Sequence, residues 1–105
     1  MKKVLFASVL LATLLFSGDY EDGQKAYEAG SYKKAIELFK KADKQGHIEA
    51  IVALGIMYEN GQGVQQDLDK ALKLYKIGID RGSDQAKLLS MMLMFKILDG
   101  KLDGQ

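Results

Sequence analysis

Few side chains in this sequence suggest catalysis, and a serine followed three residues later by a lysine is the first to consider. Ser31 and Lys34 have the Ser-x-x-Lys spacing of enzymes that acylate a serine. That chemistry also requires an oxyanion hole and further motifs, such as Ser-Asp-Asn and Lys-Thr-Gly. The stretch Ser83-Asp84-Gln85 only half resembles the first motif, and the second does not occur. We interpret Ser31, which follows a glycine and precedes an apolar helix, as a helix N-cap.

The sequence offers few side chains suited to metal binding or acid–base catalysis. The chain contains no cysteine and one histidine, His47, so disulfides, thiol nucleophiles and thiolate zinc sites are excluded. Asp67 and Asp69 fall near a predicted helix start, where carboxylates are expected in any case. The Gly61-x-Gly63 loop lacks the preceding strand of a phosphate-binding loop, and turn chemistry explains it. The sequence therefore predicts no catalytic residue, no metal site and no cofactor.

Composition narrows the class further. The 105 residues include 15 Lys and Arg against 14 Asp and Glu, which gives a net charge of about +1. A nucleic-acid binder depends on excess positive charge, so no nucleic-acid partner is expected. The apolar fraction of 48% is too high for a disordered chain, and the length suits one small domain.

The N-terminal segment predicts export. Lys2 and Lys3 precede the uncharged apolar run 4–16, and small residues follow at Ser17 and Gly18. This order is typical of a secretory signal peptide, and thirteen helical residues span only about 20 Å of a roughly 30 Å hydrocarbon core. We expect residues 1–17 to be a signal peptide and residues 18–105 the domain, located in the periplasm or secreted. An uncleaved membrane anchor and a buried N-terminal helix are the alternatives.

The rest of the chain repeats itself. Residues 35–50 align with residues 71–86 at a constant offset of 36, which pairs Phe39 with Tyr75 and Gly46 with Gly82. Apolar residues within each copy follow a helical period. The predicted helices cover residues 19–29, 31–45, 47–60, 67–81 and 84–98. Because one helix pair cannot bury its apolar face alone, neighbouring pairs are expected to stack into an all-α solenoid.

Residues 50–86 resemble a Sel1-like repeat, a relative of the tetratricopeptide repeat. The resemblance depends on Ala50, Leu54-Gly55, Tyr58, Gly61-x-Gly63-Val64, Asp67, Lys70-Ala71, Tyr75 and Gly82. Residues 23–46 look like a shortened copy, and residues 86–98 look like the first helix of a third. In that third copy Ser90, Met91 and Met94 replace Leu54, Gly55 and Tyr58. The predicted fold is therefore an α-solenoid of antiparallel helix pairs with about two and a half repeats.

The resemblance also implies a binding surface. In this family the first helices of successive repeats line a concave face. By the register of Leu54, Gly55 and Tyr58, that face would carry Glu49, Val52, Ile56, Glu59 and Asn60, followed 36 residues later by Gln85, Leu88, Met92 and Phe95. The apolar members form a strip that is either a partner surface or additional core, and the sequence leaves both open.

The expected function is a non-enzymatic scaffold or adaptor that binds a protein or peptide on its concave face. A homodimer through the same strip is one alternative, and a membrane-anchored structural protein is another. A third is a β-lactamase-like hydrolase, because some exported members of the family carry that name. The resemblance implies that those members hold a disulfide in each repeat. This chain has no cysteine, so their activity is not carried over.

Overall fold

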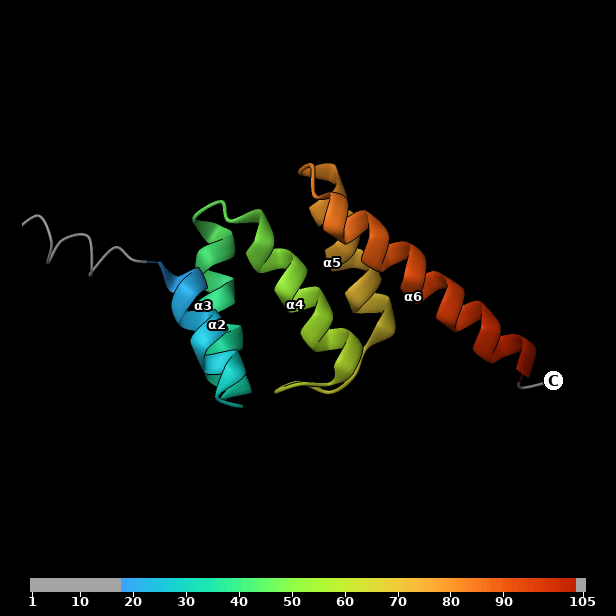
Figure 1. Ribbon diagram of the computed structural model, residues 1–105, viewed down its shortest axis with the longest axis horizontal. Helices are drawn as coiled ribbons and strands as arrows, with labels where there is room; N and C mark the ends of the chain where they lie inside the picture. Colours follow the sequence, from blue (N-terminus) through green and yellow to red (C-terminus); the bar gives the residue numbers. More distant parts are fainter. Residues whose placement is uncertain (1–17, 104–105) are drawn as a thin grey trace, which may run out of the picture.

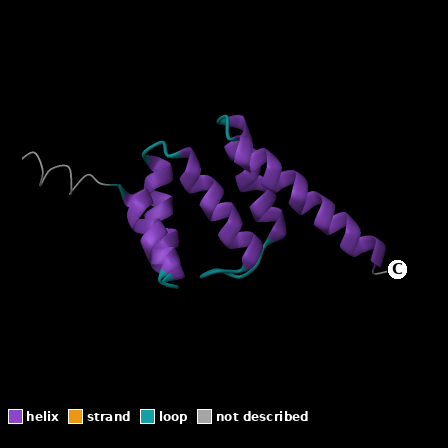
Figure 2. Cartoon of the chain, viewed as in Figure 1, coloured by secondary structure: helices purple, strands orange, loops and turns teal. Residues whose placement is uncertain are grey.

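The computed structural model describes residues 18–103, and all regular structure in that part of the chain is α-helical (Figure 1, Figure 2). The helices are α2 (Asp19–Glu28), α3 (Tyr32–Lys44), α4 (Ile48–Asn60), α5 (Leu68–Asp80) and α6 (Asp84–Asp103). They form two antiparallel pairs, α2 with α3 and α4 with α5, and α6 packs against α5. The all-α solenoid predicted from the sequence is confirmed. The predicted signal peptide, residues 1–17, lies outside the described residues.

The helix boundaries agree with the sequence prediction to within about one residue, except at the end of α6. The predicted end was residue 98, whereas the helix continues to Asp103. Gly100 lies inside it, and a single glycine weakens a helix by only about 1 kcal/mol relative to alanine. The longer α6 extends past the body of the protein, and its C-terminal half projects away from the other helices (Figure 1).

Side-chain caps begin two of the helices. The backbone N–H of Lys70 donates to Asp67 Oδ1 at 3.0 Å, and that of Ala86 donates to Ser83 Oγ at 3.0 Å. Each cap satisfies a backbone donor that the first turn leaves without a partner. Ser31 also occupies the N-cap position, of α3, but its side chain makes no capping hydrogen bond.

In each helix pair, a glycine of the first helix packs against an aromatic ring of the second. A Cβ built on Gly55 of α4 would lie 2.5 Å from Cε1 of Tyr75 in α5. A Cβ on Gly23 of α2 would lie 2.7 Å from the ring of Phe39 in α3. Because neither glycine has a side chain, the two helices of each pair approach closely at this point. Tyr75 and Phe39 are both almost fully buried, so the two pairs are built on the same contact.

Two apolar clusters make up the core. The first joins α2, α3 and α4 around Phe39, Leu54 and Met57. The second joins α4, α5 and α6, and its buried members are Ile51, Val52, Ala71, Tyr75, Ala86 and Leu93. Because α4 contributes to both clusters, it is the central helix that holds the two pairs together.

The loop between α4 and α5 is tied back to the first helix pair. The side-chain amide of Gln62 donates to the hydroxyl of Tyr27 at 2.9 Å. Gly63 has φ 74°, and a Cβ there would lie 2.9 Å from the backbone carbon of Tyr32. Gly61, with φ 67°, is the left-handed residue that ends α4. These contacts give the glycines of this loop a structural role.

Candidate functional site

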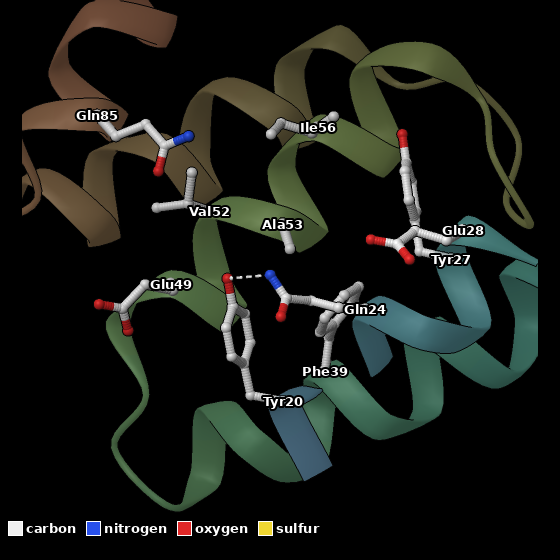
Figure 3. A pocket seen from close by; sticks show the side chains of 10 residues that line it. All are labelled: Tyr20, Gln24, Tyr27, Glu28, Phe39, Glu49, Val52, Ala53, Ile56 and Gln85. Carbon is white, nitrogen blue, oxygen red and sulfur yellow. Dashed lines mark hydrogen bonds between the residues drawn. The ribbon is translucent and has the colours of Figure 1, made fainter. Parts of the chain in front are cut away.

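A hollow of about 280 Å³ opens between α2 and α4, with α6 at one edge (Figure 3). These three are the first helices of successive repeats, so the hollow lies where the resemblance implied a concave binding face. The residues that line it are Tyr20, Gln24, Tyr27 and Glu28 from α2, Phe39 from α3, Glu49, Val52, Ala53 and Ile56 from α4, and Gln85 from α6.

The hollow has an apolar floor and a polar rim. Phe39 and Val52 are each 2% exposed and form the deepest part, while Ile56 is half-buried beside them. Gln24, Glu28, Glu49 and Gln85 are exposed around the edge. Apolar walls with a few polar groups at the margin are characteristic of binding sites in general.

The strip predicted from the sequence divides into a buried part and an exposed part. Val52 belongs to the core, because α6 covers it with Ala86 and Leu93. Leu88, Met92 and Phe95 are 58%, 59% and 73% exposed, and they follow Gln85 along α6 beyond the hollow. Of the two interpretations left open, core packing therefore applies to Val52 and surface exposure to the α6 residues.

The remaining predicted residues lie outside the hollow. Glu59 accepts a hydrogen bond from the hydroxyl of Tyr75 at 2.8 Å, which satisfies the polar group of a buried ring. Asn60 is the exposed last residue of α4. The residues brought together at the hollow are thus Glu49, Val52, Ile56 and Gln85.

The contribution of α2 to the hollow was not predicted from the sequence. An offset of 32 residues places Gly23 on Gly55, and the same offset relates Tyr20 to Val52 and Gln24 to Ile56. The helix-packing glycine was therefore the signal that could have found this wall. The concave face predicted from the 36-residue offset extended only toward the C-terminus.

The electrostatics of the hollow are acidic. Among the described residues that line it, Glu28 and Glu49 carry negative charge and none is a lysine or arginine. Burial raises the pKa of the Tyr20 phenol, and the carboxylates of Glu49 and Glu21 raise it further. Tyr20 therefore keeps its proton, and its hydroxyl also accepts a hydrogen bond from the side-chain amide of Gln24 at 3.0 Å (Figure 3).

The residues weighed for catalysis are not assembled into a reaction centre. Ser31 and Lys34 are exposed at the start of α3, and within residues 18–103 the Ser31 hydroxyl makes no hydrogen bond to Lys34. The ring of His47 stacks on that of Tyr20, with centroids 5.6 Å apart and planes 13° from parallel. His47 thus packs at the junction of α2 and α4, which is a structural role.

Comparison with known families agrees with this geometry. The family model described as Sel1 repeat matches residues 9–47 and 48–83. The chain belongs to the Sel1 repeat family. Sel1 repeats are typically protein-interaction modules, and their helical fold is typically non-enzymatic. In this Sel1 repeat protein the second match covers the α4–α5 pair and most of the repeat at residues 50–86.

Three relatives illustrate the range of proteins that contain similar repeats. HcpE of Helicobacter pylori, whose name assigns it provisionally to the beta-lactamases, is 52% identical over 45 residues, covering 43% of this chain and 13% of HcpE. An exopolysaccharide production negative regulator of Rhizobium leguminosarum is 36% identical over 69 residues, which cover 62% of this chain and 26% of the regulator. A Sel1-like repeat-containing protein of Schizosaccharomyces pombe, named as uncharacterized, is 38% identical over 71 residues, which cover 68% of this chain and 11% of that protein.

The chain thus spans about a quarter or less of the length of these relatives, so the similarity concerns the repeats. Within residues 18–103, no helix combines the length and the apolar character needed to cross a bilayer.

Proposed function

We propose that this Sel1 repeat protein is a scaffold that binds an extended or helical segment of a partner protein in the hollow between α2 and α4. The observation that carries the proposal is a hollow with an apolar floor and an acidic rim on the first helices of successive repeats. Ala53 and Ile56, which are half-buried on α4, offer an apolar anchor a surface above the buried Phe39, and burial of such a surface is how a partner gains most of its affinity.

The rim suggests the chemistry of the partner. Glu28 and Glu49 lie on opposite helices of the hollow, and both are exposed. A lysine or arginine on each side of the apolar anchor would meet one of these carboxylates, and charge complementarity favours the correct partner over others. The protonated hydroxyl of Tyr20 is a donor for a carbonyl group of the bound segment. The proposed ligand is therefore an apolar peptide flanked by basic residues.

Selection from a displayed random-peptide library tests this proposal. We expect the wild-type protein to enrich sequences with an apolar anchor between basic residues. The variant Glu28→Lys/Glu49→Lys should instead lose those sequences. Glu37→Lys/Asp80→Lys changes the net charge equally at exposed positions away from the hollow, so it should select as the wild type does. Identical enrichment by all three proteins, or no enrichment, would contradict the proposal.

We also propose that the protein is exported. The proposal rests on the basic start at Lys2 and Lys3 and on the uncharged apolar run 4–16. The intact mass of protein from a periplasmic fraction tests it. A mass that lacks residues 1–17 is expected, whereas a mass of all 105 residues in the membrane fraction would support an uncleaved anchor instead.

No observation favours a hydrolase as a second function. Ser31 has the spacing of a nucleophile, but it is the exposed N-cap residue of α3 and does not line the hollow between α2 and α4. Support for the hydrolase hypothesis would require that purified protein hydrolyse a chromogenic β-lactam and that Ser31→Ala lose this activity.

A further inference from the structure

The outer surface of α6 carries a large contiguous apolar patch. Its exposed side chains are Leu88, Met91, Met92, Met94, Phe95 and Leu98, each between 53% and 73% exposed. Single exposed apolar residues are normal on a protein surface, but six on consecutive turns of one helix mark an interaction site. We name these six residues the α6 patch.

The α6 patch lies on the side of the helix that faces away from the body. Ala86 and Leu93 pack into the core at 0% and 1% exposure. At 100° per residue, Phe95 lies about 160° around the helix from Leu93 and about 180° from Ala86. Another molecule could therefore approach this surface without meeting α4 or α5.

The α6 patch does not fit a following helix packed as α3 packs on α2 or α5 on α4. In α2 and α4 a glycine receives the aromatic ring of the second helix, with Gly55 under Tyr75 in the complete repeat. The 36-residue offset places Met91 at the position of Gly55, and Met94 at that of Tyr58. The methionine side chain fills the space that the ring of a repeat partner helix would need, so a different packing geometry is required.

The spacing of the patch suits a second copy of the same helix. Leu88, Met91, Phe95 and Leu98 follow intervals of three, four and three residues, which is the apolar seam of paired helices. Helix α6 contains three lysines and three aspartates, so two copies meet without net repulsion. Methionine side chains also adapt readily to a facing surface.

The available area is also sufficient for a dimer. With roughly 100 Å² exposed by each of the six side chains, two copies bury on the order of 1,200 Å², the lower limit for a specific stable interface. We propose that the chain forms a homodimer through the α6 patch, with the two bodies on opposite sides of the helix pair. This dimer leaves the hollow between α2 and α4 open.

Sedimentation equilibrium of the purified full chain tests the dimer. The wild-type protein should fit a monomer–dimer equilibrium, and Phe95→Asp should raise the dissociation constant about tenfold or more. Ile77→Asp is the matched control, because Ile77 is a 39% exposed apolar residue on α5, outside the patch, and this variant should associate as the wild type does. Circular dichroism establishes that each variant is folded, and Met91→Asp replaces Phe95→Asp if that variant is not.

Two results would overturn the proposal. One is a wild-type protein that is monomeric at every concentration at which it stays soluble. The other is a folded Phe95→Asp or Met91→Asp variant that dimerises as strongly as the wild type, because association would then use another surface. Both results leave the test of the hollow unaffected.

Discussion

The ring of Tyr75 packs directly on the backbone of Gly55, so that a Cβ on this glycine would lie 2.5 Å from the ring carbon Cε1. The hydroxyl of the same tyrosine donates to Glu59, one turn further along α4. A single side chain of α5 thus sets both the distance and the register between the two helices of the complete repeat. That repeat also supplies one wall of the hollow, so the site depends on this contact.

Gly55→Ala should therefore destabilise the protein. Alanine has the higher helix propensity by about 1 kcal/mol, but it forces a buried ring to move, which costs typically 1–3 kcal/mol. We expect a net loss of about 1 kcal/mol in the free energy of urea unfolding. Gly100→Ala is the control, because a Cβ there would meet no atom of the described residues within 4 Å beyond its own helix backbone, and the propensity gain should be retained. An equal gain in both variants would contradict the close contact.

The buried phenol predicts a loss of stability at high pH. Burial raises the pKa of Tyr75 above its ordinary value, and the hydrogen bond to Glu59 and the negative charge of that carboxylate raise it further. The folded state then keeps a proton that the unfolded state releases above about pH 10. Stability is unaffected below that pH and falls above it, by at most about 1.4 kcal/mol per pH unit.

Urea unfolding measured between pH 8 and pH 11, a range of about three units around the phenol pKa, tests this linkage. Tyr75→Phe should be less stable at neutral pH by about 1 kcal/mol, because Glu59 loses its donor. It should also show a flatter decline above pH 10 than the wild type. Parallel declines in the two proteins would assign the alkaline sensitivity to other groups, such as Tyr20.

Equivalent positions in two repeats should respond differently to the same charge. Val52 is 2% exposed in the core, whereas Leu88, its equivalent 36 residues later, is 58% exposed. Val52→Asp buries an unpaired carboxylate. It should remove most of the free energy of unfolding, which for a domain of this size totals about 5 kcal/mol or more. At a protein concentration low enough to keep the chain monomeric, Leu88→Asp should change stability by no more than about 0.5 kcal/mol. Circular dichroism during thermal unfolding distinguishes them, and similar melting of both would refute the assigned burial.

The two N-cap positions provide a smaller test. Asp67 accepts a hydrogen bond from the Lys70 backbone, so Asp67→Ala should cost about 1 kcal/mol. Ser31 makes no such bond, and Ser31→Ala should cost distinctly less. Chemical denaturation of both variants measures the difference. A larger loss for Ser31→Ala would show that its hydroxyl caps α3 in solution.

The sequence predicted the helix pairs because their determinants are local. Apolar periodicity, the left-handed Gly61 that ends α4 and the cap at Asp67 each act within one or two turns. The burial of Val52 could not be predicted in the same way, because it depends on Ala86 and Leu93 of a helix that begins more than thirty residues later. The repeat register placed Val52 on the face of α4 that lines the hollow, but it did not determine how deeply the side chain is buried.

The composition of the site was only partly predictable for a related reason. The forward offset of 36 is constant, whereas the first copy has a shorter loop and a different offset. The wall formed by Tyr20 and Gln24 therefore becomes clear only when Gly23 is aligned with Gly55. Contacts between repeats, such as the ion pair between Arg81 and Asp43, leave no periodic signal in the sequence.

The most direct test of the central claim is to map a selected basic–apolar peptide on the isotopically labelled protein by NMR. Binding in the hollow predicts that amide shifts concentrate at residues of α2 and α4 such as Gln24, Ala53 and Ile56, with Gln85 at the margin. Glu28→Lys/Glu49→Lys should abolish those shifts, while Glu37→Lys/Asp80→Lys should retain them. Shifts confined to the outer face of α6, or spread over the outside of α3 and α5, would contradict a binding site between α2 and α4.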